Sequence, residues 1–272
     1  MSRTLAPAVW STLAAFAGFG LLAATVFAGA GDDAGTQPHA LRVADAPALK
    51  GQAVSATVGD VKLAGYVSKP EGAGPFPTVI MLHEWWGLNA HIKQQADTLA
   101  KEGYAVFAPD LYDGKVATDP KTAGQYMNEV DQATALKTLK ASYQWVRSQA
   151  FSKGKKIGSV GWCMGGGNSL QLALNEPIDA AVVYYGMVEK DPAVLKKLKG
   201  PLLGIFADRD GWITPALVKD FEAALKATPV KHDIHHYDAD HAFANPSNPN
   251  YKSDMATDAW NKTLAFFKAN LR

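Results

Sequence analysis

Short apolar runs and helical patterns alternate along most of this chain. Residues 79–82 (Val-Ile-Met-Leu) are uniformly apolar, as strands are when both faces of a sheet are covered. Further short strand-like stretches, with helical patterns between most of them, occur at residues 105–108, 157–161, 180–185, 201–206 and 232–237. The alternation predicts one α/β domain with a mostly parallel central sheet and helices on both of its faces.

The ends of several elements carry local signals. Residues 52–58 and 61–68 are rich in strand-forming residues, and Gly59-Asp60 between them is typical of a hairpin turn. Asn89 predicts the start of a helix because its side chain can accept a hydrogen bond from the first turn. Thr214-Pro215 predicts another start. Two longer helical patterns cover residues 121–149 and 255–269.

Residues 1–30 differ in composition from the rest of the chain. Arg3 is their only charged side chain, and an apolar run from Leu5 to Phe27 ends in Ala28-Gly29-Ala30. This pattern describes a secretory signal peptide and predicts a periplasmic or secreted protein. An uncleaved membrane anchor is the alternative, since the run could span a bilayer; the intact mass of the native protein distinguishes the two. Residues 31–50 are expected to form a flexible leader, and residues 51–272 the folded domain.

The charge of the chain argues against two kinds of partner. The formal net charge is +1, and no cluster of Lys and Arg stands out. Nucleic acid is therefore not expected as the main partner. There is also no polybasic surface for a membrane, so membrane contact is expected only through an uncleaved N-terminal segment. The sequence leaves the oligomeric state open.

Cys163 is the only cysteine among 272 residues. Exported proteins usually pair their cysteines, and a single cysteine cannot pair within its own chain. It is therefore an inert buried residue, half of an intermolecular disulfide, or a thiol kept for chemistry.

The residues around Cys163 favour the last possibility. Gly161-Trp162-Cys163-Met164-Gly165 stands where a predicted strand runs directly into a helix. The serine version of this pattern is a sharp turn that presents a nucleophile, and the flanking glycines avoid collisions at the bend. The N-terminus of the following helix should favour the thiolate, and the backbone N–H of Met164 should face a developing oxyanion. The alternative is a small core residue on a glycine-rich turn.

Such a nucleophile needs a base and an acid that orients the base, and in this arrangement the acid precedes the base along the chain. His241 follows the last predicted strand, at the end where open parallel sheets bind ligands, so we expect it to be the base. The loop after residues 201–206 offers two candidate acids, Asp208 and Asp210. Core or surface roles are expected for the other downstream histidines, His232, His235 and His236.

Five segments then follow one another in a distinctive order: HEWWGLN (83–89), APDLYDG (108–114), VGWCMGG (160–166), DRDGWITP (208–215) and DADHAFAN (238–245). Together they resemble the dienelactone hydrolase family of α/β-hydrolases, from about residue 52 to the C-terminus. The resemblance implies an α/β-hydrolase fold and a triad of Cys163, Asp210 and His241. It also implies that Glu84 takes up the thiol proton and that the Trp85 N–H is the second oxyanion donor. From the residues alone, Glu84 could equally cap its loop or pair with a lysine.

The sequence departs from the family pattern in its cations. Family members that hydrolyse dienelactone bind the substrate carboxylate with arginines, whereas residues 242–245 and 112–130 contain no arginine. Lys115 and Lys121 could replace them only as point charges. Four tryptophans fall on predicted site loops and indicate either an aromatic-lined cleft or core packing: Trp85, Trp86, Trp162 and Trp212. We expect Trp86, Trp162 and Trp212 to contact the substrate.

These patterns predict an enzyme that hydrolyses small esters or lactones through Cys163, with no metal and no organic cofactor. An exported redox-active thiol protein is the first alternative, although the chain has no second cysteine to resolve an oxidised thiol. A catalytically inactive binding domain is the second.

Overall fold

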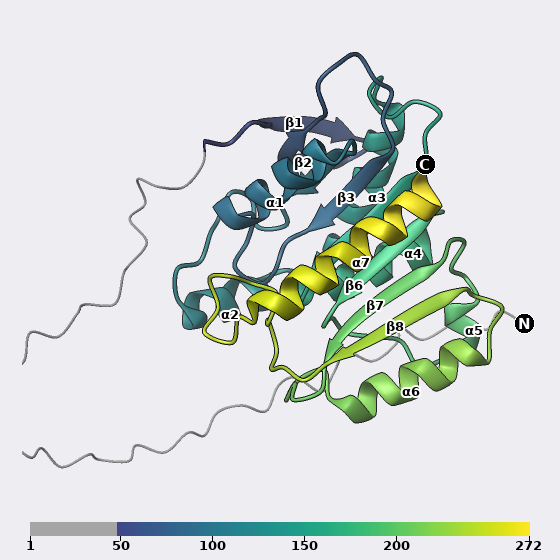
Figure 1. Cartoon of the computed structure of the whole chain (residues 1–272). Helices are drawn as coiled ribbons and strands as arrows, with labels where there is room; N and C mark the ends of the chain where they lie inside the picture. Colours follow the sequence, from purple (N-terminus) through teal and green to yellow (C-terminus); the bar gives the residue numbers. More distant parts are fainter. Residues whose placement is uncertain (1–47) are drawn as a thin grey trace, which may run out of the picture. The chain divides into compact units, whose positions relative to one another are not determined.

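The computed structural model describes residues 48–272, and the predicted signal segment and most of the predicted leader lie outside this part. Its centre is an eight-stranded sheet in the order β1-β2-β4-β3-β5-β6-β7-β8 (Figure 1). The strands are β1 (Gln52–Val58), β2 (Val61–Ser68), β3 (Thr78–Leu82), β4 (Ala105–Pro109), β5 (Ile157–Trp162), β6 (Ala180–Tyr184), β7 (Leu202–Ala207) and β8 (His232–Tyr237).

Most of the sheet is parallel, as predicted. β1 pairs with β2 as an antiparallel hairpin, and β2 pairs antiparallel with β4, whereas every pairing from β4 to β8 is parallel. The hairpin turn has Gly59 at a φ of 59°, a backbone conformation that glycine adopts without steric cost. The predicted hairpin and the mixed α/β class are therefore confirmed.

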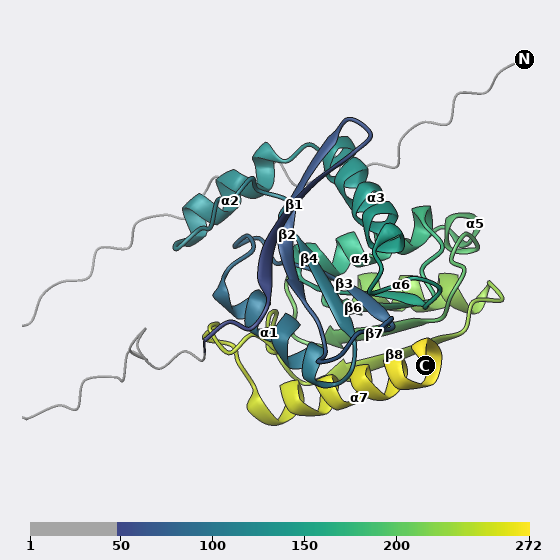
Figure 2. The same cartoon turned by 90° about the horizontal axis from the view of Figure 1, so that it is seen from above.

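Helices cover both faces of the sheet (Figure 2). They are α1 (Ala90–Lys101), α2 (Pro120–Glu129), α3 (Gln132–Ser148), α4 (Met164–Asn175), α5 (Pro192–Leu195), α6 (Pro215–Lys226) and α7 (Ser253–Leu271). Helices α1 and α7 pack on one face, and α3, α4 and α6 pack on the other. In residues 48–272, no helix combines the length and the apolar character needed to cross a bilayer.

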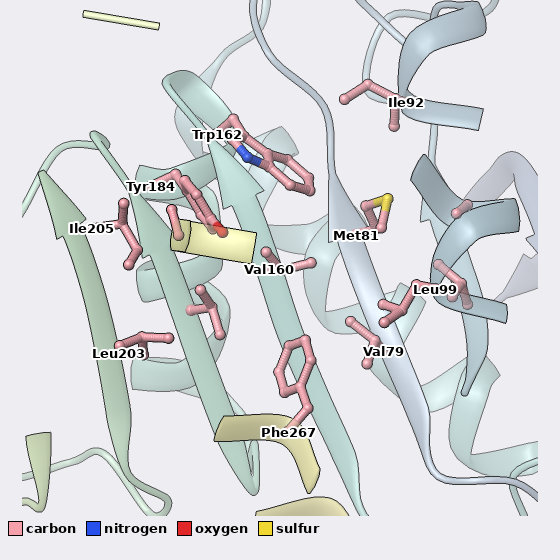
Figure 3. Close-up of a cluster of buried hydrophobic side chains, with 14 of the residues drawn as sticks. Val79, Met81, Ile92, Leu99, Val160, Trp162, Tyr184, Leu203, Ile205 and Phe267 are labelled. Atoms are coloured by element: carbon pink, nitrogen blue, oxygen red, sulfur yellow. The ribbon is translucent and has the colours of Figure 1, made fainter. Parts of the chain in front are cut away.

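Alternation along the central strands divides the core into two halves. In β3, Val79 and Met81 pack with the cluster under α1 and α7, whereas Ile80 and Leu82 pack with the cluster under α3, α4 and α6. Figure 3 shows the first cluster, in which Phe267 of α7 lies near the side chains of the strands. All four of these β3 residues are fully buried, which explains why the run is apolar without alternation.

Predicted helix starts agree with the structure, but one predicted helix is two. The Asn89 side chain accepts from Ile92 N–H, and Thr214 accepts from Leu217 N–H. The stretch 121–149 is interrupted, because Asp131 caps α3 by accepting from Thr134 N–H. A capping residue has non-helical backbone angles, so a cap inside an apolar pattern ends the preceding helix.

A buried carboxylate ties the start of the described chain to α1. Asp97 of α1 accepts hydrogen bonds from the Lys50 N–H at 2.9 Å, the Gly51 N–H at 3.1 Å and the Tyr66 hydroxyl at 2.9 Å. Burial, together with the bond to Asp97, raises the pKa of Tyr66 to about 12. Three donors therefore converge on one carboxylate that has little contact with water.

We expect Asp97→Asn to lower the free energy of unfolding by about 1–3 kcal/mol, because a neutral amide replaces the charged acceptor of three donors, one of them the buried Tyr66 hydroxyl. Urea denaturation measures the change. The matched control is Asp60→Asn in the exposed β1–β2 turn, where a change within about 0.5 kcal/mol is expected. Equal stability of the two variants would contradict the importance of this cluster.

Candidate active site

The predicted site residues come together because they follow parallel strands. Glu84 stands two residues after β3, Cys163 directly after β5, Asp210 three residues after β7 and His241 four residues after β8. The carboxyl ends of parallel strands meet at one edge of a sheet, where such folds bind their ligands.

The backbone at Cys163 is strained, as the turn predicted from the sequence requires. Its φ is 55° and its ψ is −120°, a region that residues with a side chain rarely occupy. A Cβ at Gly161 would overlap the carbonyl oxygen of Gly165, and a Cβ at Gly165 would overlap that of Leu82. The Cys163 N–H is held by the Tyr184 carbonyl at 3.0 Å. Glycine at both positions therefore permits a close approach that fixes the turn.

The sequence predicts two backbone N–H groups as oxyanion donors, those of Met164 and Trp85. The N–H of Met164, the first residue of α4, interacts with the Cys163 thiol and lowers its pKa. Trp85 lies in the loop after β3, and its N–H has no hydrogen-bond partner within residues 48–272. That these two N–H groups hold a developing oxyanion stays a prediction.

The ionisation of Cys163 differs from the expectation. The sequence predicts a thiol whose pKa is lowered by the helix N-terminus, but the pKa of Cys163 is raised. Burial is the largest cause, followed by the charges of Glu84 and Asp210, and together they outweigh the Met164 N–H. Cys163 therefore rests as a protonated thiol at neutral pH, because helix N–H groups at one side cannot replace lost water.

Asp210 and His241 form a close pair. Nδ1 of His241 lies 2.6 Å from Oδ2 of Asp210, whose side chain is completely buried. The other carboxylate oxygen accepts from the N–H groups of Trp212 at 2.8 Å and Ile213 at 3.0 Å. Burial alone would raise the pKa of Asp210, but the bonds from His241 and the backbone lower it. Asp210 is therefore a carboxylate, and a carboxylate beside Nδ1 favours a proton on that nitrogen.

The second candidate acid lies elsewhere. Asp208 contacts Nδ1 of His236 at 3.0 Å, and Nε2 of His236 contacts Glu222 at 2.6 Å. These bonds raise the pKa of His236 against its partial burial, which lowers it. His235 contacts Asp233 at 3.0 Å. Of the two aspartates in the loop, only Asp210 contacts His241.

Aromatic rings enclose His241. Its ring centroid lies 5.1 Å from that of Tyr185 and 4.7 Å from that of Trp212. Its Nε2 is buried and has no hydrogen-bond partner in the described part of the chain. In the neutral ring with its proton on Nδ1, beside Asp210, Nε2 is the nitrogen that can accept a proton.

Glu84 is almost completely buried, at 3% exposure. Its Oε2 accepts a hydrogen bond of 2.5 Å from Nδ2 of Asn245. Burial raises the pKa of Glu84 to about 7, although the bond from Asn245 acts in the opposite direction. The charge of Glu84 raises the pKa of both Cys163 and Tyr185, so the carboxylate lies close to both groups.

Sequence reasoning missed two buried residues that lie close to Glu84, Asn245 and Tyr185. Asn245 ends the segment DADHAFAN, four residues after His241, and Tyr185 follows β6, next to β5 in the sheet. Tyr185 has a positive φ of 33°, and its hydroxyl is buried without a hydrogen-bond partner within residues 48–272. The position of both at carboxyl ends of strands, or just beyond them, was the available signal.

His83 is a buried residue that links two loops at this edge of the sheet. It is fully buried, its Nδ1 lies 2.6 Å from the Glu84 carbonyl oxygen, and its Nε2 accepts from the Leu111 N–H at 3.1 Å. Burial lowers its pKa, so the ring is neutral and joins the loops after β3 and β4.

The tryptophans divide into two groups. The rings of Trp85 and Trp86 lie 5.1 Å apart, those of Trp85 and Trp212 lie 6.1 Å apart, and Trp212 is 60% exposed. These three form an aromatic rim beside His241. The prediction that Trp162 contacts the substrate is wrong, because Trp162 is 6% exposed and stacks on Trp260 of α7 in the core.

The described residues offer no evident metal centre: in residues 48–272, no three His, Cys, Asp or Glu side chains are arranged to hold an ion. The carboxyl ends of the strands bring together a thiol, an imidazole–carboxylate pair and a buried carboxyl group.

Comparison with known proteins identifies the family of this chain. A sequence profile of the dienelactone hydrolase family matches residues 63–271. The protein named usf of Aquifex pyrophilus is 36% identical over 233 residues, which cover 81% of this chain and 99% of usf. A protein of Aquifex aeolicus with the provisional name carboxymethylenebutenolidase is 32% identical over 234 residues, covering 82% of this chain and 100% of its own.

A solved structure of a similar protein has the same fold. The crystal structure of a provisionally named dienelactone hydrolase from Klebsiella pneumoniae matches with a TM-score of 0.74 and 28% identity, covering 82% of this chain and 99% of that chain. The fold is therefore that of the α/β-hydrolases, as predicted. The family profile spans more than half of the chain and agrees with relatives above 30% identity, so the chain belongs to the dienelactone hydrolase family.

Proposed function

We propose that this protein hydrolyses esters or lactones of small molecules, with Cys163 as the nucleophile, His241 as the base and Asp210 as the residue that orients it. The observation that carries the proposal is the 2.6 Å bond between Asp210 and His241, which leaves Nε2 of His241 as a proton acceptor at the edge where the strained Cys163 turn lies. The name of the Aquifex aeolicus relative, which refers to a butenolide, supports a lactone.

The first half of the reaction begins with a protonated thiol. Glu84, with a pKa of about 7, takes the proton from Sγ, and the thiolate attacks the carbonyl carbon. The N–H groups of Met164 and Trp85 stabilise the resulting oxyanion. When the C–O bond breaks, the departing alkoxide takes up the proton held by Glu84, and a thioester remains on Cys163. A lactone opens in the same step without losing a fragment.

In the second half, water replaces the alcohol. Nε2 of His241 accepts a proton from water, and the hydroxide attacks the thioester. The imidazolium is stabilised by the Asp210 carboxylate, which hydrogen-bonds Nδ1. Breaking of the C–S bond releases the acid, and the proton on His241 returns to the thiolate.

The cations near the site favour a neutral substrate. Lys115 pairs with Glu129 at 2.9 Å, and Arg209 pairs with Asp238 and Asp240. A substrate carboxylate would have to compete with these partners. The rim of Trp85, Trp86 and Trp212 instead presents apolar surface, which suits the uncharged part of an ester.

The raised pKa of Cys163 argues against the alternative of a redox-active thiol, since oxidation begins from the thiolate. A catalytically inactive binding domain would show no ester turnover even with Cys163 in place.

Replacing the thiol tests the nucleophile. Cys163→Ala should reduce turnover of a p-nitrophenyl ester by at least ~10³-fold, because no thioester can form. Circular dichroism and the melting temperature establish that the variant folds. Turnover near that of the unaltered protein would exclude the proposed mechanism, and absence of turnover in both would favour a binding domain.

Asp210→Asn and Asp208→Asn together test which aspartate orients His241. Asp210→Asn removes the charge that stabilises the imidazolium, so kcat should fall by ~10²-fold or more with little change in KM. Asp208→Asn should change kcat only a few-fold and affect mainly the melting temperature, because Asp208 contacts His236. An active, well-folded Asp210→Asn protein beside an inactive Asp208→Asn protein would reverse the assignment.

Substrate charge can be tested with two esters that differ only in a carboxylate. We expect kcat/KM for the neutral ester to be at least equal to that for the anionic one. A ~100-fold preference for the anion, about 2.7 kcal/mol in transition-state binding, would contradict this expectation. Lys115, Lys121 and Arg209 would then be replaced singly to find the responsible cation.

A further inference from the structure

The Glu84 carboxyl group has one short hydrogen bond, from Asn245, that has no role in the reaction proposed above. Within residues 48–272, the only side chain that hydrogen-bonds the Glu84 carboxyl group is Asn245, at 2.5 Å. Both side chains are buried, at 3% and 4% exposure. A buried carboxyl group with one short polar contact depends on that contact for its orientation and for its charge.

The orientation of the Asn245 amide is fixed by its own loop. Its Oδ1 accepts from the Ser247 N–H at 2.8 Å, its N–H donates to the Ala242 carbonyl at 3.0 Å, and its carbonyl accepts from Asn248 at 2.9 Å. Turning the amide over would break the bond from Ser247 and place an oxygen against a carboxylate. The group facing Glu84 is therefore the NH₂ group, which can only donate.

We propose that Asn245 is a positioning residue for the general base Glu84: its amide holds the carboxylate in place and favours the ionised form that takes the thiol proton. The inference rests on the proposed function, in which Glu84 is that base. An uncharged donor stabilises a carboxylate less than a cation does, so Glu84 can both accept and release a proton near neutral pH.

The other titratable groups near Glu84 do not stabilise its charge. Cys163 from the β5–α4 turn and Tyr185 from the end of β6 would repel its charge if they ionised, and both have raised pKa values. His83, the preceding residue, is neutral. The Asp210–His241 pair influences the thiol through the charge of Asp210. Among these groups Asn245 is the one that lowers the pKa of Glu84.

The ionisation of Glu84 determines how activity should change with pH. Transfer of the thiol proton requires ionised Glu84, so activity should rise with pH through the pKa of Glu84, about 7. Loss of the Asn245 donor raises that pKa. Activity at pH 7 should therefore fall, and activity at high pH should return towards that of the unaltered enzyme.

The test uses Asn245→Asp, which keeps the acceptor for the Ser247 N–H but replaces the donor with a carboxyl oxygen, and Asn245→Ala, which removes both. The matched control is Asn248→Asp, which adds the same charge to the same loop; Asn248 bonds only its own loop. The readouts are the pH profile of kcat/KM for a neutral p-nitrophenyl ester and the ¹³C NMR titration of the Glu84 carboxyl carbon.

In Asn245→Asp, we expect the Glu84 titration and the acidic limb of the profile to move to higher pH by about one unit or more, so kcat/KM at pH 7 falls about ten-fold. The loss should appear in kcat more than in KM. Asn245→Ala should shift in the same direction by less, and Asn248→Asp should match the unaltered enzyme. If Asn245→Asp does not fold, Asn245→Ala decides the question.

An unchanged Glu84 titration in a folded Asn245 variant would overturn the inference, as would a loss of activity that is equal at every pH. The NMR titration needs no turnover, so it tests Asn245 even if the proposed function fails. Failure of the proposed function appears separately, as full activity in Cys163→Ala.

Discussion

The close approach of β5, α4 and the end of β3 is the constraint on which the site depends. Gly161 and Gly165 permit it, and a side chain at either position would collide with backbone. The contact forces Cys163 into its strained conformation, and it sets the first N–H of α4 on one side of the sulfur. The same contact brings the chain leaving β3, with Glu84, close enough for its charge to act on the thiol.

Opposing electrostatic effects meet at this junction. The N–H of Met164 favours a thiolate, whereas burial and the charges of Glu84 and Asp210 favour a thiol, and the second set dominates. In the proposed mechanism, the proton of the resting Cys163 thiol must move before the sulfur can attack the substrate. Glu84 is suited to receive it, because burial raises its pKa to about 7 and the Asn245 donor prevents a larger rise.

Much of this arrangement could be predicted from the sequence because strand patterns, turn residues and chain order are local signals. The hairpin at Gly59 and the junction at Cys163 were predicted in this way. Effects that depend on distant packing were not predictable. The pKa of Cys163 depends on burial by several loops, Trp162 is buried because α7 covers it, and the partner of Glu84 lies 161 residues away in the sequence.

Protonated thiols react slowly with simple electrophiles, since the thiolate is the reactive form. Cys163 at neutral pH should therefore be only slowly modified by small alkylating reagents or mild oxidants, even while ester turnover proceeds. Resistance to such reagents is then no argument against a cysteine enzyme. If the proposed mechanism holds, a suitable covalent probe would resemble the acyl group of the substrate, reach the proposed oxyanion donors at Trp85 and Met164, and capture the sulfur as its proton leaves.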